Sequence, residues 1–151
     1  MRTPGALAEA TRATVVIPGT GEFFCATEEV TRTGPDGTQL SENRHTTIAP
    51  TDIEASLRQM ATALPNVERV SFVVSWFGTD LRAGHCEIKP GVDISAKDTD
   101  PLTWSVSGIG RDAAHVISVT NERANYGGTP SDESVVQGIR ELKARGYDVM
   151  L

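Results

Sequence analysis

The sequence predicts an α/β fold, the front part of a barrel that is truncated after its second barrel strand. Three observations support this prediction. A helix with clear start and stop signals spans residues 51–64, an apolar β-branched run follows at 67–77, and a second helix leads into another strand at 147–151. A helix joined by a short connection to a strand that is apolar on both faces is typical of parallel sheets.

The chain length agrees with part of a barrel. At 151 residues the chain can form one domain, but a complete eight-fold α/β barrel needs about 250 residues. The sequence stops within the strand at 147–151, and a buried strand needs partners at its edges. We therefore expect a lead-in over residues 1–50 and a partial barrel over residues 51–151.

The lead-in is predicted to contain a β-hairpin and a loop. Residues 1–12 lack a sustained apolar face and are expected to be loosely ordered. The β-rich runs 13–18 and 22–27 are separated by Gly-Thr-Gly at 19–21, which predicts two antiparallel strands joined by a tight turn. Residues 33–43 concentrate glycine, proline and aspartate and predict an exposed loop.

The first helix, residues 51–64, has a capping box at its start. Thr51 and Glu54 are spaced so that each side chain can accept a hydrogen bond from a free backbone N–H group of the first turn. Pro65 ends the helix. Its apolar face repeats at helical spacing through Ile53, Leu57, Met60, Ala61 and Leu64.

A long insertion, residues 78–128, follows the strand at 67–77. Glycines and prolines break its pattern, and the runs 103–107 and 113–120 predict the strands of a side hairpin. Loops longer than about 12 to 15 residues are commonly functional. An insertion at the end of a buried strand is therefore where a site or an interface is expected.

The second helix, about residues 130–145, has its own start and stop signals. Thr129 is the expected N-cap, Pro130 the first helical residue, and Asp132 is placed to oppose the helix dipole. Gly146 ends the helix. We expect residues 70–76 and 147–151 to be neighbouring parallel strands, with this helix packed across them as a right-handed crossover.

Composition and charge exclude several classes of partner. The formal net charge is −6 and the isoelectric point is near 5.0, without a basic cluster, which argues against direct nucleic-acid binding. The sequence contains neither an apolar run long enough for a membrane span nor a secretory signal, so synthesis in the cytoplasm is expected. Cys25 and Cys86 form no CxxC pair. No cofactor is predicted.

Candidate ligand-binding residues follow the strand at 67–77. Asp80, His85 and Cys86 lie past its carboxyl end, which is the catalytic rim in barrel folds, and Trp76 could stack on a sugar ring or fill the barrel mouth. Adjacent residues on an extended segment point to opposite sides, which disfavours His85 and Cys86 as a base and nucleophile pair. The substrate-binding candidates are Trp76, Asp80 and His85, and the catalytic residues are unknown.

Two other kinds of site find no support in the spacing. No two of the histidines and cysteines that could ligate a metal stand at ligand spacing on one regular element, so no metal site is predicted: His45, His85, Cys86 and His115. Carboxylates are available for glycoside hydrolysis, but sequence alone places no two at the roughly 5 to 10 Å separation required: Asp80, Glu87, Asp93 and Asp132.

Three separated motifs resemble one known family. They are residues 73–81 (VVSWFGTDL), 84–92 (GHCEIKPGV) and 126–146 (YGGTPSDESVVQGIRELKARG). They resemble the barrel-like domain of the large tail-tip protein of gene transfer agents, which are phage-like particles that move DNA between bacteria. Related phage tail proteins are often described as glycoside hydrolase-like. With the upstream segment ATRATVVIPGTGEFFCATE, the resemblance extends over residues 10–151.

The resemblance implies a (β/α)8 barrel of the TIM type and a place in a phage-like tail tip or baseplate. The implied partners are other tail and baseplate proteins, together with cell-wall glycan. Barrel glycoside hydrolases carry their acid and nucleophile after later strands, four and seven, so the family's catalytic residues cannot be transferred to any position here.

Three hypotheses remain open at this stage. The first is a structural or cell-wall-engaging part of a tail-tip protein, and the second is part of a glycoside hydrolase whose catalytic carboxylates lie downstream. The third is a small independent α/β enzyme that uses Asp80, His85 and Cys86. Under the first two, we expect the chain alone to be inactive, marginally stable and prone to self-associate through an apolar face that includes Val73, Val149 and Leu151.

Overall fold

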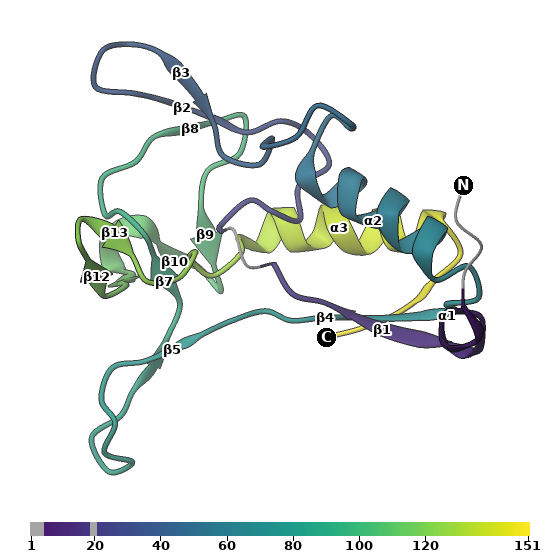
Figure 1. Ribbon diagram of the computed structural model, residues 1–151. Coiled ribbons are helices and arrows are strands. Elements are labelled where there is room, and N and C mark those ends of the chain that lie inside the picture. The colour runs from purple at the N-terminus through teal and green to yellow at the C-terminus, as the bar shows by residue number, and fades with distance from the viewer. Residues whose placement is uncertain (1–4, 19–20) are drawn as a thin grey trace.

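The centre of the molecule is a three-stranded parallel sheet. The computed structural model describes residues 5–18 and 21–151. Strand β4 (Arg69–Phe72) lies in the middle of the sheet, between β1 (Ala13–Val16) and β14 (Asp148–Met150). Figure 1 shows the three strands running side by side in one direction. The strands that the sequence places at 70–76 and 147–151 are thus parallel neighbours, as predicted, but β4 ends at Phe72 and residues 73–76 are not part of the strand.

Two helices cover one face of this sheet. They are α2 (Asp52–Ala63) and α3 (Asp132–Ala144), and Figure 1 shows both on the same side of β1 and β4. Val70 and Phe72 point from β4 toward the helices and are buried with Leu57 and Leu142. At Gly138 a Cβ atom would lie 3.1 Å from the Phe72 ring. The absence of a side chain at this position therefore allows α3 to pack closely on the sheet.

The connections at the two ends of the sheet differ in length. At the amino ends of the strands, α2 reaches β4 through residues 64–68, and α3 reaches β14 through residues 145–147. At the carboxyl ends, β1 is followed by a long segment before α2, and β4 by another before α3. In Figure 1 the small strands of the second segment gather beyond the carboxyl ends of the sheet.

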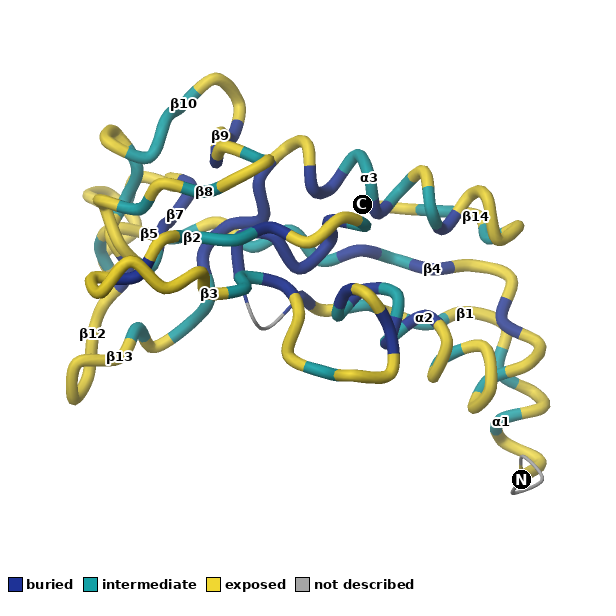
Figure 2. The backbone as a smooth tube through the Cα atoms, turned by 90° about the horizontal axis from the view of Figure 1, so that it is seen from above, coloured by how far each residue is buried: buried dark blue, intermediate teal, exposed yellow. Residues whose placement is uncertain are grey.

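These long segments form small sheets around a second core. Phe23, Val30, Val92 and Trp104 are buried in this core. Figure 2 shows that buried residues run along β4 and through the middle of the molecule, whereas the tips of the insertion are exposed. The short elements are α1 (Ala6–Ala10), β2 (Thr31–Thr33), β3 (Gln39–Ser41), β5 (Phe77–Gly78), β6 (Ile88–Lys89), β7 (Gly91–Val92), β8 (Thr99–Asp100), β9 (Ser105–Val106), β10 (Ile109–Gly110), the 3-10 helix η1 (Arg111–Ala113), β11 (His115–Val116), β12 (Val119–Thr120) and β13 (Arg123–Ala124).

The predicted hairpin between residues 13–18 and 22–27 is wrong. Strand β1 pairs with β4, and the second run is a series of turns in which the N–H of Ala26 donates to the carbonyl of Phe23. The apolar residues of this run are buried as turn residues beneath the helices and the insertion. Gly19 and Thr20 of the predicted turn lie outside the described residues. The sheet therefore contains three parallel strands, where the sequence predicted two.

Three further local predictions need correction. Residues 33–43 were expected to form a loop, but the strands β2 and β3 pair across a short turn there, with β8 on the other side of β2. The runs 103–107 and 113–120 do not pair with each other, because β9 pairs with β10 and β11 pairs with β7. Residues 6–10 of the lead-in, expected to be loosely ordered, form helix α1, and the side chain of Asn66 donates to the carbonyl of Glu9 at 2.7 Å.

The helix boundaries are confirmed to within two residues, but the caps differ. Thr51 is the N-cap of α2, yet its hydroxyl caps no backbone group, and Glu54 pairs with Arg58. The N-cap of α3 is Ser131, whose hydroxyl accepts from the N–H of Ser134. The sequence had assigned this role to Thr129. That residue is buried and used elsewhere, as described below.

The architecture is a mixed α/β fold, and the described residues form small sheets without a closed barrel. No helix in residues 5–18 and 21–151 has the length and apolar character needed to cross a membrane. Within the part of the chain that the structure describes, no helix covers the face of the sheet opposite α2 and α3. Val15 and Met150 lie there and are 54% and 67% exposed, whereas Val149 packs against the core and was wrongly placed on the exposed face.

Candidate functional site

Side chains from the sheet and from the insertion meet just past the carboxyl end of β4. The Ser75 hydroxyl lies 3.3 Å from the Tyr126 hydroxyl. The ring of Phe77 meets Tyr126 edge to face at 6.0 Å between centroids, and it lies 6.4 Å from the His115 ring. All four side chains are partly buried. We call Ser75, Phe77, His115 and Tyr126 the rim cluster.

Hydrogen bonds made by Thr129 hold the rim cluster in place. Thr129 accepts a hydrogen bond from the N–H of Gly91 at 2.9 Å and donates one to the carbonyl of Ser75 at 2.7 Å. The N–H of Thr129 also donates to the carbonyl of Gly91. A Cβ atom at Gly91 would lie 2.5 Å from the Phe77 ring, so a glycine is required for the ring to sit there. These contacts attach the insertion to the end of the central strand.

Trp76 lies next to this cluster in sequence, but its side chain points to the opposite side of the segment. Successive residues of an extended segment point in opposite directions. Ser75 and Phe77 both contact Tyr126, so Trp76 points away from them. Its side chain is 40% exposed. The tryptophan is available to a ligand at the carboxyl end of the sheet, but outside the rim cluster.

Asp80 and His85 lie farther out, on a hairpin arm formed by β5, β6 and the loop between them. Figure 1 shows this arm projecting from the body of the molecule. Both carboxylate oxygens of Asp80 accept hydrogen bonds from Arg82, and the N–H of His85 donates to the carbonyl of Arg82. Among the interactions of the described residues, none joins Trp76 to Asp80 or His85. The structure therefore does not bring the three predicted residues together.

The arm also offers little to an enzyme that would use Asp80, His85 and Cys86. The hydrogen bonds from Arg82 lower the pKa of Asp80, which makes this carboxylate a weak base. The thiol of Cys86 faces the carbonyl of Glu87 at 3.7 Å. These contacts stabilise the turn of the arm, and among the hydrogen bonds of the described residues none joins the Cys86 thiol to a basic side chain.

A buried cluster of charges holds the insertion against the lead-in, and sequence reasoning did not find it. The ammonium of Lys97 lies 3.3 Å from Glu22, 2.7 Å from Glu42 and 2.8 Å from Asp93. Arg111 donates to both carboxylate oxygens of Glu22, at 3.0 and 2.6 Å. The side chains of Glu22 and Lys97 are only 1% and 3% exposed. Isolated charged residues in polar stretches carry no sequence signal of such burial.

The carboxylates and the cations of this charge cluster balance one another. Burial raises the pKa of Glu22, with Arg111 and Lys97 opposing the rise. Burial disfavours the charge on Lys97, but the surrounding carboxylates outweigh it and raise the pKa of the ammonium. Ligand oxygens of Glu22, Glu42 and Asp93 lie within 4.8 Å of one another, a spacing that could hold a metal ion. Because the Lys97 ammonium contacts all three carboxylates, we assign the cluster a structural role.

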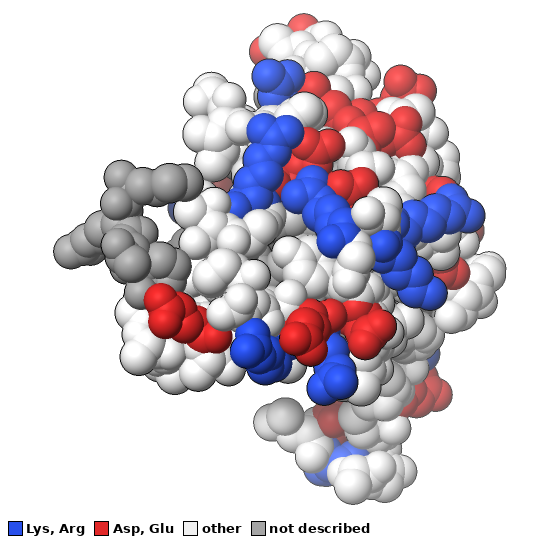
Figure 3. Space-filling model, turned by 90° about the vertical axis from the view of Figure 1, so that its right-hand side faces the viewer, with Lys and Arg blue, Asp and Glu red and all other residues white. Residues whose placement is uncertain are grey.

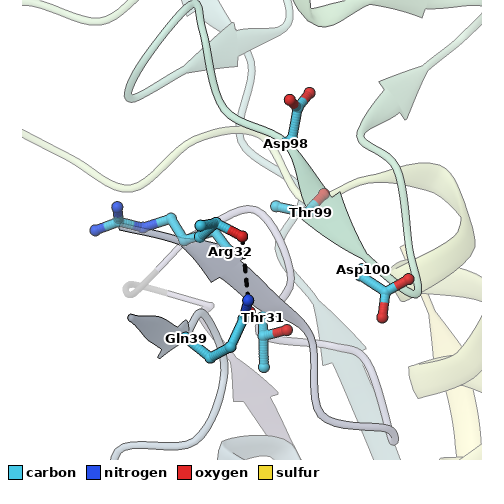
Figure 4. Close-up of a pocket in the computed structure, with 7 residues that line it drawn as sticks. Thr31, Arg32, Gln39, Asp98, Thr99 and Asp100 are labelled. Carbon is cyan, nitrogen blue, oxygen red and sulfur yellow. Dashed lines mark hydrogen bonds between the residues drawn. The ribbon is translucent and has the colours of Figure 1, made fainter. Parts of the chain in front are cut away.

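A polar cavity of about 490 Å³ opens over the small sheet β3-β2-β8. Figure 4 shows that Thr31 and Gln39 come from the hairpin and that Asp98 and Thr99 come from the insertion. The amide of Gln39 donates to the hydroxyl of Thr33 at 3.1 Å. This cavity has no aromatic wall against which a sugar ring could pack: its lining is Thr31, Arg32, Thr33, Gln39, Asp98, Thr99 and Asp100.

The charges at the opposite end of the molecule are mixed. Figure 3 shows the side that lies at the right of Figure 1, where the parallel strands begin, with blue and red side chains interspersed. On that face Lys and Arg do not form a separate patch. Arg69 and Asp148, from neighbouring strands, lie 3.9 Å apart and are mostly exposed. Surface pairs of this kind contribute little stability.

The fold and the rim cluster define a mixed α/β protein with hydroxyl and aromatic groups at the carboxyl end of a parallel sheet. Comparisons with protein-family models, with curated proteins and with solved structures found no match. The function must therefore be argued from the site.

Proposed function

We propose that the chain forms the first strands of a barrel-like, glycoside hydrolase-like domain in the tail tip or baseplate of a phage-like particle such as a gene transfer agent. In that setting it engages cell-wall glycan and contacts other tail and baseplate proteins. One observation carries the barrel part of this proposal. Three parallel strands follow one another in sequence order, β1-β4-β14, and both connecting helices cover the same face.

A barrel adds each strand beside the last with every helix outside, and the three strands follow this pattern. One half of a doubly wound sheet has the same arrangement, and the resemblance of the sequence favours the barrel of the two. The connections point the same way, because the short ones lie at the amino ends and the long ones at the carboxyl ends. Barrel proteins place their binding loops at the carboxyl ends. We therefore propose a truncated barrel that contains three strands in place of two.

Glycan engagement is supported by what lies at that end of the sheet. Trp76 offers an exposed indole, and the rim cluster adds hydroxyl and aromatic groups. Sugar sites commonly combine an aromatic platform with a few hydrogen-bonding groups. The residues of the rim cluster include no carboxylate, which favours binding over hydrolysis, because hydrolysis needs a pair of carboxylates. A hydrolase completed by carboxylates outside this chain is the alternative.

Sedimentation with insoluble peptidoglycan tests the proposal. The purified chain should pellet with the wall material and stay in solution without it. Trp76→Ala should lower the pelleted fraction several-fold, whereas Leu81→Ala should not, because Leu81 is fully exposed on the arm, away from the sheet. Failure of the wild-type chain to pellet would overturn glycan engagement.

The same samples distinguish binding from hydrolysis. We expect the chain alone to release no reducing sugar from peptidoglycan. Measurable release that disappears in Asp80→Asn would make the arm a catalytic site and would contradict the expectation that the chain alone is inactive.

A further inference from the structure

We propose that the hairpin arm is a self-association surface, through which two copies of the chain pack the apolar sides of their arms against each other. The main apolar side chains of this surface are Leu81, in the loop of the arm, and Ile88, on β6. The inference goes beyond the proposed function. It does not depend on glycan engagement, which rests on Trp76.

The arm has one face toward the body of the molecule and one face away from it. The ring of Phe77 lies on the first face, where it meets Tyr126. Gly78 is the next residue of β5 and pairs with Ile88 of β6. Because successive strand residues point to opposite faces and paired residues share a face, Ile88 lies on the face turned away from Phe77. Its side chain is 65% exposed.

The outward face around Ile88 is apolar. A Cβ atom at Gly78 would lie 2.8 Å from the thiol sulfur of Cys86 and 3.8 Å from Cδ1 of Ile88. The side chains of Cys86 and Ile88 therefore both lie over Gly78, and the glycine leaves room for them. Leu81 is fully exposed in the adjoining loop. We call Gly78, Leu81, Cys86 and Ile88 the arm patch.

The arm has little support of its own. Strands β5 and β6 have two residues each, and among the described residues neither pairs with a third strand. A two-stranded hairpin is only marginally stable in water, and a further layer against its apolar face stabilises it. The arm of a second copy supplies such a layer when a two-fold rotation brings the same patch of each copy together.

The charges of the arm are compatible with a second copy. The chain carries a net charge of −6, so two copies repel each other on average. On the arm, Asp80 pairs with Arg82 at 2.7 Å and Glu87 pairs with Lys89 at 2.5 Å. Two acids and two bases give the arm a formal charge of zero. Two arms can therefore approach each other without bringing unpaired like charges together.

The size of the arm patch makes the association reversible. A stable interface buries about 800 Å² on each partner, which is roughly a tenth of the 9097 Å² accessible surface of this chain. The arm patch provides only part of that area. We therefore expect a monomer at low micromolar concentration and a dimer as the concentration approaches the millimolar range.

Sedimentation velocity over this concentration range tests the proposal. The average mass of the wild-type chain should rise from 16.1 kDa toward twice that value. Leu81→Asp places a charge on the arm patch at a fully exposed position, where it disturbs no buried contact, and should keep the chain monomeric. Met150→Asp is the matched control. Met150 is 67% exposed on the face of the central sheet, so this substitution should leave the association unchanged.

Cross-linking of the unaltered chain locates the contact. A two-fold contact between arm patches brings the two Cys86 thiols close together, whereas Cys25 is buried. A short bismaleimide should therefore link Cys86 to Cys86 in the wild-type chain, and much less in Leu81→Asp.

Several results would overturn the arm as an interface. They are a wild-type chain that stays monomeric at every concentration, association that survives Leu81→Asp, association that Met150→Asp abolishes, and equal yields of the Cys86 link with and without Leu81. Each of these results leaves the proposed glycan engagement standing, because that proposal is tested by pelleting with Trp76→Ala.

Discussion

Replacing Lys97 with methionine should destabilise the protein strongly, because it leaves buried carboxylates without their shared cation. Glu22 would keep Arg111, and Glu42 would keep Arg32 at 2.6 Å. Glu42 and Asp93 would lose their contacts of 2.7 and 2.8 Å to the ammonium, and the remaining cation of Asp93, Arg111, lies 3.7 Å away. Removing one partner from a buried ion pair costs about 3 to 5 kcal/mol. We expect a loss of this size in the free energy of unfolding at pH 7, measured by urea denaturation.

The matched control is Lys89→Met. Lys89 pairs with Glu87 on the arm, and both side chains are largely exposed. Surface pairs contribute about 0 to 1 kcal/mol. If Lys97→Met cost no more than this control, the charge cluster would not be the buried, mutually dependent structure described above.

The pH dependence of the Lys97→Met effect provides a second check. Burial raises the pKa of Glu22 above its ordinary value of 4.5, and Lys97 opposes this rise. Without Lys97 the folded-state pKa of Glu22 rises further, so the folded variant binds a proton more readily than its unfolded form does. Stability of the variant then increases as pH falls from 7 toward 4.5. The cost of the substitution should therefore be smaller at pH 5 than at pH 7, and an equal cost at both would refute the reasoning.

Three further predictions concern single positions. Thr129→Val should lower the free energy of unfolding by about 1 to 3 kcal/mol, because it leaves the buried N–H of Gly91 and the carbonyl of Ser75 unpaired. In the same urea titration Thr51→Val should be nearly neutral, because the buried Thr51 hydroxyl has no partner among the described residues. Iodoacetamide should label one thiol of the folded chain, Cys86, and two after unfolding, because burial raises the pKa of Cys25 to about 12; mass spectrometry that finds Cys25 labelled in the folded chain would contradict its burial. Gly91→Ala should lower the melting temperature, because the new Cβ displaces the Phe77 ring, and an unchanged melting curve would mean that the ring moves freely.

The sequence predicts those elements whose signals are local. The apolar face of α2 and its stop at Pro65 lie within one segment, and so do the start of α3 and its end at Gly146. The apolar run at 67–77 indicates a strand with both faces covered; the structure has a strand there, but β4 spans only Arg69–Phe72 and helices cover only one face of it. For the two helices periodicity and breakers agree, and the structure follows them.

The wrong predictions concern pairing over long distances. The run that forms β1 is correctly read as extended, but nothing in its residues says that its partner is β4 and not its neighbour at 22–27. Phe23 and Cys25 are apolar because they fill the core as turn residues, and their alternation only resembles that of a strand. The contact between Ser75 and Tyr126 and the burial of Glu22 beside Lys97 also depend on tertiary structure.

The uncovered face of the central sheet links the fold to the proposed function. Val15 and Met150 are apolar and exposed there, beside a cavity of about 310 Å³, and the outer edges of β1 and β14 have no strand partner among the described residues. An exposed apolar face with unpaired strand edges is a surface on which further strands or another chain can pack. Further strands added beside β14 and β1 would convert this face into a barrel interior and would bring additional carboxyl-end loops next to Ser75 and Tyr126. The same added strands would then cover the apolar face of the sheet and complete the glycan site.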